Sequence, residues 1–130
     1  MTRFWITLGQ GVNFVLRCIE QMKGGEVFIP KISSMKIVDL ADVIAPEAAK
    51  KIIGVRPGEK LHEVLITEEE ARRTREFEDY FVIEPDFPFW GQKNKGLQEG
   101  KQVPEGFRYA SDTNDRWLTK DELRKIVEEL

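Results

Sequence analysis

The sequence predicts an α/β fold with α+β character. Short strand-like segments and amphipathic helical segments alternate along the 130 residues, which is typical of a mixed helix-and-strand domain. Hydrophobic residues make up 41% and charged residues 33%, a composition that favours a globular chain over a disordered one. The strand candidates are few and short, and half are too polar for a buried parallel sheet. We therefore do not expect a complete doubly wound domain.

The first two elements are a strand and a long helix. The segment TRFWIT (residues 2–7) alternates and is rich in aromatic and β-branched residues, which predicts a short strand. Thr7 and Gln10 match an S/T-x-x-E/Q capping box, and Gly24-Gly25 marks the end of the following helix. The apolar residues that recur at helical spacing are Leu8, Val12, Val15, Leu16, Ile19 and Met22.

A second strand and a second helix follow. EVFI (residues 26–29) predicts a strand that ends at Pro30. Ser33-Ser34 offers an N-cap for the next helix, which Pro46 closes. The predicted apolar face of this helix consists of Ile37, Leu40, Ala41 and Ile44.

The central part of the chain predicts two more strands. KIIGV (residues 51–55) reads as a third strand, and DYFVIE (residues 79–84) as a fourth. Between them, a short helix is expected after the Pro57-Gly58 corner, at residues 61–65.

Two further capping boxes mark helix starts. Thr67 and Glu70 open the segment EEEARR, and Thr119 and Glu122 open a C-terminal helix. The apolar stripe of this last helix consists of Leu123, Ile126, Val127 and Leu130.

Residues 85–114 lack a regular pattern. A structureless segment of this length is uncommon inside a compact domain. A free linker has little use for aromatic side chains, so we expect this segment to pack on another surface. Its aromatic residues are Phe87, Phe89, Trp90, Phe107 and Tyr109.

Charge and residue content exclude several kinds of protein. The net charge of −3 gives no basic field, so no nucleic-acid partner is expected. Cys18, the single cysteine, is interpreted as a small core residue in a reducing compartment, and with one histidine no metal site is expected. No apolar run reaches the roughly 18 residues of a membrane span, and no signal peptide is visible. We expect a soluble, cytoplasmic protein without membrane association.

An arginine and a glutamate flank a rigid corner in the stretch VRPGEK. The guanidinium of Arg56 can form paired hydrogen bonds to phosphate oxygens. Pro57 presets φ, Gly58 removes a side chain that would crowd a ligand, and the helix expected here would point its N–H groups outward. The carboxylate of Glu59 suits the vicinal hydroxyls of a ribose. Together these features favour a nucleoside diphosphate site, and the alternative is a surface turn with a capping glutamate.

Three other candidates are weaker. Arg3 lies on the first strand, where it is either a second phosphate ligand or an edge-strand charge, and the local pattern favours the latter. For His62 a general-base role competes with the default interpretation of a helix-surface imidazole. TLGQGVNF (residues 7–14) carries the first two glycines of a dinucleotide-binding loop, but Phe14 stands in place of the third, so we reject it as a cofactor site.

Four separated segments carry a family resemblance: MTRFWITL, GGEVFIPKISSMKIVDLADVIAP, IIGVRPGEKLHEVLIT and SDTNDRWLT. In this order they resemble the C-terminal part of the inverting UDP-N-acetylglucosamine 4,6-dehydratases, which are extended short-chain dehydrogenase/reductases. The resemblance spans Met1 to about Leu123. It implies that NADP binds an N-terminal Rossmann domain, that UDP-N-acetylglucosamine binds largely to a C-terminal subdomain, and that the full-length protein forms homo-oligomers.

The resemblance also implies roles for individual residues. By match to the family's R-P-G-E/D pattern, Arg56 would hold the diphosphate of the substrate and Glu59 its ribose. By match to the T-R-F/Y segment, Arg3 would be a second phosphate contact. No residue of this chain is assigned a catalytic role.

The sequence departs from the family in lacking the cofactor machinery. Neither tyrosine belongs to a Tyr-x-x-x-Lys pair, because Glu84 follows Tyr80 and Thr113 follows Tyr109 at the fourth position, and no glycine-rich loop is present. The chain therefore looks like the substrate-binding subdomain with the Rossmann core missing. We expect it to bind no NADP and to catalyse no dehydration by itself.

A division of the chain follows from the resemblance. Residues 1–84 would form the nucleotide-sugar-binding subdomain, residues 85–118 an aromatic-rich extended arm, and residues 119–130 a C-terminal helix. A non-catalytic nucleotide-sugar-binding or oligomerisation module is the alternative interpretation. A helical protein-interaction domain without a ligand is the third.

Overall fold

The computed structural model describes residues 1–86 and 99–129 of the chain. These residues form two compact units. The first unit contains Met1–Trp5, Ile32–Val64 and Ala110–Leu130, and the second contains Ile6–Lys31 and Leu65–Tyr109. The chain thus passes between the units several times, and each unit is assembled from segments far apart in the sequence.

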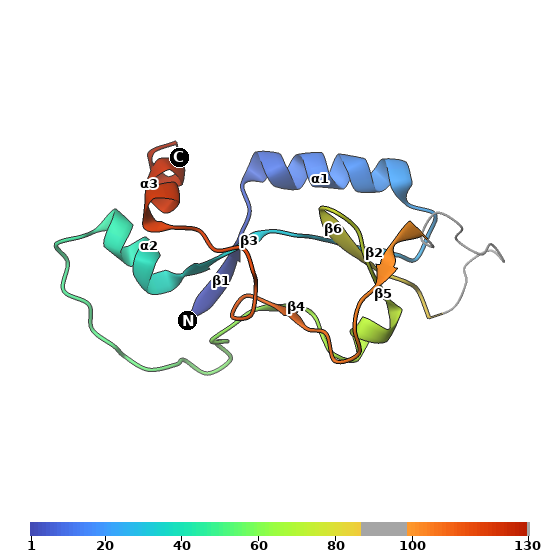
Figure 1. The fold of residues 1–130 in the computed structure, drawn as a ribbon. Coiled ribbons are helices and arrows are strands. Elements are labelled where there is room, and N and C mark those ends of the chain that lie inside the picture. The colour runs from blue at the N-terminus through green and yellow to red at the C-terminus, as the bar shows by residue number, and fades with distance from the viewer. Residues whose placement is uncertain (87–98, 130) are drawn as a thin grey trace. The chain divides into compact units, whose positions relative to one another are not determined.

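The first unit is built on a two-stranded antiparallel sheet. Strand β1 (Thr2–Trp5) pairs with β3 (Ser33–Lys36), with Thr2 opposite Lys36 and Trp5 opposite Ser33. Two helices, α2 (Ile37–Ile44) and α3 (Lys120–Glu128), lie side by side in this unit (Figure 1). α3 contributes the fully buried Leu123 to the core.

The second unit contains a four-stranded antiparallel sheet. Its strand order is β2 (Val27–Pro30), β6 (Tyr80–Ile83), β5 (Thr74–Glu76) and β7 (Lys101–Gln102). The 3₁₀ helix η1 (Glu70–Arg73) leads directly into β5. A separate pair is formed by β4 (Val64–Ile66) and β8 (Tyr109–Ala110).

Helix α1 (Leu8–Gln21) covers this sheet through an aromatic cluster (Figure 1). The buried ring of Tyr80 stacks on Phe77 at 4.8 Å and meets Phe14 of α1 edge-on at 6.3 Å. The Tyr80 hydroxyl donates to Gln21 at the end of α1, 2.8 Å away. Burial raises the pKa of Tyr80, so the phenol remains a neutral donor in this contact.

Several sequence-based predictions are confirmed. The predicted strands at residues 2–7, 26–29 and 79–84 correspond to β1, β2 and β6. Two of the three predicted capping boxes, at Thr7 before α1 and at Thr119 before α3, open α-helices and show the reciprocal hydrogen bonds of that motif. The third, Thr67 with Glu70, forms the same bonds but precedes only the 3₁₀ helix η1.

The prediction that Ser33-Ser34 caps a helix is wrong. Both residues lie in β3, and α2 begins only after Lys36. The backbone N–H of Ser34 donates to Arg116 and its carbonyl accepts from Leu118. These tertiary hydrogen bonds hold Ser34 in an extended conformation that its local cap propensity does not reveal.

Two predictions near the candidate corner are also wrong. No strand forms at residues 51–55, where Gly54 has φ of 83° and Ile52 is 96% exposed. No helix forms at residues 61–65, because Val64 begins β4. The carbonyl of Leu61 instead accepts the N–H of Thr2 at 2.9 Å, so pairing with β1 replaces the helical hydrogen bonds.

The aromatic segment is only partly described. Phe107 and Tyr109 lie 5.3 Å and 5.1 Å from the ring of Phe81, so these two rings pack within the chain itself. Phe87, Phe89 and Trp90 lie outside the described residues. The division into residues 1–84, 85–118 and 119–130 stays a prediction about function.

A membrane-spanning helix is not found in the described residues, since none of their helices is long and apolar enough.

Candidate functional site

Arg56 and Glu59 lie at the two ends of one tight turn in the first unit. The N–H of Glu59 donates to the carbonyl of Arg56 at 3.0 Å. Pro57 supplies the fixed φ that the second turn position prefers, and Gly58 supplies the positive φ of 81° that a type II turn requires at the third. The Pro-Gly pair therefore closes the chain locally and brings Arg56 and Glu59 together.

The Glu59 side chain reinforces this turn. Its Oε2 accepts the backbone N–H of Arg56 at 3.1 Å, so the turn carries one hydrogen bond in each direction. The predicted helix N-terminus is absent, and the turn therefore offers no helix dipole to an anion. One carboxylate oxygen of Glu59 therefore has the capping role that the alternative interpretation gives it. The second oxygen has no hydrogen bond in the described part of the chain.

The Arg56 side chain is available to a ligand. It is exposed, and within residues 1–86 and 99–129 its guanidinium makes no hydrogen bond or ion pair. A guanidinium offers five N–H donors in a planar fork that matches phosphate oxygens. A guanidinium without a partner among the described residues, on the same turn as a carboxylate, is compatible with the nucleoside diphosphate site that the sequence predicts.

Arg3 is engaged with the backbone that follows this turn. Its Nη1 donates to the carbonyls of Thr2 at 2.7 Å and of Leu61 at 3.4 Å, and its Nη2 donates to that of Lys60 at 2.9 Å. Its Nε lies 3.3 Å from the carboxylate of Glu63. One hydrogen on Nη2 is left over in this count. The role of Arg3 as a second phosphate contact stays a prediction.

A buried hydrogen-bonded cluster lies beside the Arg3 contacts, and sequence reasoning did not find it. Thr2 Oγ1 lies 2.8 Å from His62 Nδ1 and 2.7 Å from Ser111 Oγ. Ser111 is fully buried and Thr2 is 7% exposed. The helix-surface interpretation of His62 is wrong, because the residue lies in a non-helical segment and its ring bonds to β1. His62 and Ser111 are 60 and 109 positions away from Thr2, so no local pattern signals the cluster.

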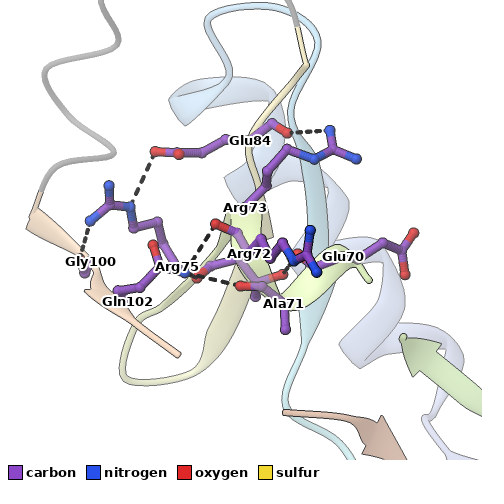
Figure 2. A network of polar contacts seen from close by, with 9 residues as sticks. Glu70, Ala71, Arg72, Arg73, Arg75, Glu84, Gly100 and Gln102 are labelled. Carbon is purple, nitrogen blue, oxygen red and sulfur yellow. Dashed lines mark hydrogen bonds and ion pairs between the residues drawn. The ribbon is translucent and has the colours of Figure 1, made fainter. Parts of the chain in front are cut away.

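Arg73 and Arg75 of the second unit, unlike Arg56, bind other protein groups. Figure 2 shows Arg73 and Arg75 on either side of Glu84, where Arg73 Nη1 donates to the Glu84 carbonyl and Arg75 Nε meets its carboxylate. Arg73 also pairs with Asp86 at 3.0 Å. These contacts hold β5 against β6, and a hollow of about 650 Å³ beside them is lined in part by Arg73 and Glu84. None of Arg3, Arg56 and Glu59 lines that hollow.

The thiol and the potential metal ligands were the remaining candidates. Cys18 is half-buried on α1 and is not a core residue as interpreted, and its partial burial raises the pKa of the thiol, which favours the protonated form. No group of three or more metal-ligating side chains occurs among the described residues.

Comparisons with known proteins bear on the family. Residues 1–85 match the family model described as polysaccharide biosynthesis protein. The inverting UDP-N-acetylglucosamine 4,6-dehydratase of Campylobacter jejuni is 48% identical over 98% of this chain and 40% of its own length. The UDP-glucose 4-epimerase of Rickettsia canadensis is 33% identical over 98% of this chain and 38% of its own. The X-ray structure of Pen from Bacillus thuringiensis matches all of this chain and 38% of Pen, with a TM-score of 0.76 and 29% identity.

These matches confirm the sequence-based resemblance and the fold class. The chain spans about two fifths of the length of the curated relatives it matches, as predicted for the C-terminal part of an inverting UDP-N-acetylglucosamine 4,6-dehydratase. The same mixture of short strands and packed helices occurs in Pen, which matches all of this chain. Because the family model covers more than half of the residues, the chain belongs to the family of polysaccharide biosynthesis proteins.

Proposed function

We propose that this chain is the UDP-sugar-binding portion of an inverting UDP-N-acetylglucosamine 4,6-dehydratase. The observation that carries the proposal is the unengaged guanidinium of Arg56 on the same rigid turn as Glu59. The 48% identity to a protein of that name supports the choice of substrate. Relatives named for UDP-N-acetylglucosamine and for UDP-glucose match the same segment, so the shared chemistry is a uridine diphosphate joined to a hexose.

The three predicted site residues have distinct roles in this proposal. Arg56 forms paired hydrogen bonds to the diphosphate, which neutralise part of its charge. Glu59 accepts hydrogen bonds from the ribose hydroxyls through the oxygen that the turn leaves unused. Arg3 orders the backbone at Lys60 and offers its remaining N–H to the phosphates.

The reaction itself belongs to the larger protein in this account. NADP, when bound to the Rossmann domain of the full-length protein, supplies hydride transfer. This chain contains no Tyr-x-x-x-Lys pair and no glycine-rich loop, so its residues bind and orient the nucleotide end of the substrate. By itself the chain releases no 4-keto sugar.

The exposed apolar face of α1 is consistent with a chain that forms part of a larger protein. Leu8 is 85% exposed, and the helix contains no buried residue. An apolar stripe of this length on a monomeric protein marks an interaction surface. We propose that the Rossmann domain of the full-length protein or a second subunit of a homo-oligomer covers it.

A segment replacement tests the function directly. This chain would replace the matched segment of the Campylobacter jejuni relative, and formation of 4-keto sugar from UDP-N-acetylglucosamine would be followed. We expect an active chimaera whose KM rises at least about tenfold in Arg56→Ala, whereas the 130-residue chain with NADP gives no product. Product from the chain alone, or an unchanged KM in Arg56→Ala, contradicts the proposal.

The alternative is a non-catalytic module that binds a nucleotide sugar or promotes oligomerisation. The sequence contains no Tyr-x-x-x-Lys pair and no glycine-rich loop, which favours a non-catalytic role for a chain that acts separately. A folded chimaera that binds UDP-N-acetylglucosamine without converting it, next to an active parent relative, would favour this alternative.

A further inference from the structure

We propose that Ser111, Thr2 and His62 form a one-way hydrogen-bond relay that fixes the Arg56–Glu59 turn in place. In this relay His62 is a positioning residue for nucleotide-diphosphate binding and not an acid or base. The inference rests on the proposed function, which it extends to three residues that neither the sequence nor the family resemblance assigned.

The relay joins two backbone segments through buried hydroxyls. The N–H of Glu63 donates to Ser111 Oγ at 2.9 Å, and the N–H of Ser111 donates to the Glu63 carbonyl at 2.9 Å. Ser111 Oγ lies 2.7 Å from Thr2 Oγ1, which lies 2.8 Å from His62 Nδ1. Residues 61–63 are thereby held by β1 on one side and by Ser111 on the other.

Counting protons gives the relay its direction. Ser111 Oγ already accepts the N–H of Glu63, so its own hydrogen is free to donate to Thr2 Oγ1. The hydrogen of Thr2 Oγ1 then has His62 Nδ1 as its only acceptor among the described residues, and Thr2 is 7% exposed, so Nδ1 is the unprotonated nitrogen in the relay. In the reverse direction, the hydroxyl hydrogen of the fully buried Ser111 would have no acceptor among the described residues, which is unfavourable by about 1–3 kcal/mol.

The turn depends on this anchor because it has few other attachments. All of residues 51–60 are exposed, and no hydrogen bond or ion pair of the described chain involves residues 51–55. After the turn, Arg3 binds the Lys60 carbonyl and Thr2 binds the Leu61 carbonyl. The first fixed points next to Glu59 are therefore made by β1, and the relay fixes the register of β1 against residues 61–63.

A positioning role of the relay predicts a loss of ligand affinity and not only a loss of stability. If the relay holds the turn, breaking it lets Arg56 and Glu59 sample more orientations, and ligand binding then loses affinity through the cost of ordering them. A substitution elsewhere that removes one buried threonine hydrogen bond lowers stability without this loss. Thr74 provides the matched control, since its fully buried hydroxyl donates to the Glu70 carbonyl at 2.8 Å in the second unit.

The single histidine of the chain makes the test direct, because an imidazole ¹H–¹⁵N spectrum of the 130-residue chain contains one ring. We expect a ring that carries its proton on Nε2, with no proton on the Nδ1 that faces Thr2. In UDP titrations of the same samples, Thr2→Val and His62→Leu should raise the Kd about tenfold, the equivalent of about 1.4 kcal/mol. Thr2→Ser and His62→Asn, which keep a polar atom in place, should stay near the parent value, as should Thr74→Val.

Each outcome has a clear reading. A ring protonated at Nδ1 overturns the relay. A parent Kd in both Thr2→Val and His62→Leu overturns the positioning role and leaves the proposed function standing, and so does an equal loss in Thr74→Val. No UDP binding by the folded parent overturns the proposed function and the positioning role together. Thr2→Val and His62→Leu act on different elements, so a folding failure in one leaves the other to decide.

Discussion

The carboxylate of Glu59 accepts the backbone N–H of Arg56 at 3.1 Å, so one predicted ligand-binding residue holds the backbone of the other. The relationship makes the two residues a single structural unit that the Pro-Gly corner preforms. A preformed unit binds a ligand with less ordering of its side chains than two independent residues do. Substitutions within the turn should therefore affect UDP binding more than their small effect on stability suggests.

Gly58→Ala should weaken UDP binding about tenfold. No atom lies within 4 Å of the added methyl group, so the effect is conformational and not steric. The positive φ of 81° costs an alanine roughly 1–2 kcal/mol, which shifts the turn to other conformations. Isothermal titration with UDP measures the change in Kd.

Gly106→Ala is the matched control for this prediction. Gly106 has φ of 75° in a Pro-Glu-Gly-Phe turn of the second unit, and its methyl group also enters open space. It should lower stability by a similar amount and leave the Kd for UDP unchanged. Equal losses of UDP affinity in Gly58→Ala and Gly106→Ala would show that the effect is not specific to the Arg56–Glu59 turn.

Glu59→Gln should separate the two tasks of this side chain. The amide oxygen can still accept the N–H of Arg56, so the turn is kept, whereas the ribose hydroxyls lose a charged acceptor. We expect affinity for UDP to fall about fivefold, the equivalent of about 1 kcal/mol, and to fall further in Glu59→Ala. Equal affinities of all three proteins for UDP would remove Glu59 from the site.

Acid should destabilise the starts of η1 and α3. The N–H and then the hydroxyl of Thr67 hold the pKa of Glu70 below its ordinary value of 4.5, and Thr119 does the same for Glu122. Because the folded-state pKa is lowered, this stabilisation is complete above the ordinary value and is lost as pH falls through the folded value. Thermal unfolding followed from neutral pH into the acid range should show this loss.

Glu70→Gln and Glu122→Gln should flatten that acid dependence, since glutamine keeps the capping hydrogen bonds without a titrating group. Glu128→Gln, near the end of α3, is the matched control, because its carboxylate has no hydrogen bond within the described residues. An acid limb that is unchanged in the Glu70→Gln and Glu122→Gln double variant would contradict this account.

The exposed face of α1 should drive self-association of the isolated chain. Val15 and Leu16 are each 56% exposed on the apolar stripe. Leu16→Glu should therefore shift the chain toward monomer in sedimentation velocity experiments at rising concentration, while Asn13→Glu adds the same charge beside the stripe and should not. A parent chain that stays monomeric throughout would contradict the proposal that another protein surface covers this face.

Local signals in the sequence predicted the regular elements well. Thr7 with Gln10 and Thr119 with Glu122 marked two helix starts correctly, because a capping box is formed by residues three positions apart. The alternating segment TRFWIT marked β1 for a similar reason. The turn at Arg56–Glu59 was also predictable, because proline and glycine act on their own backbone.

Elements set by distant partners were not predictable in this way. Ser34 looks like a helix cap, but hydrogen bonds from residues 116–118 place it in a strand. Residues 61–65 look helical, but their backbone groups bond to Thr2 and Ser111 and not to one another. The cluster of Thr2, His62 and Ser111 was missed on the same physical grounds, since each bond joins segments that only the folded chain brings together.

The most direct test of the central claim is a comparison of UDP with uridine as ligands of the 130-residue chain. If Arg56 binds the diphosphate, Arg56→Ala should weaken UDP binding at least about tenfold and leave uridine binding unchanged. Arg124→Ala, which removes an exposed arginine paired with Asp121 on α3, should change neither. Calorimetric titrations in which Arg56→Ala binds UDP as tightly as the parent, or loses UDP and uridine equally, would contradict the account.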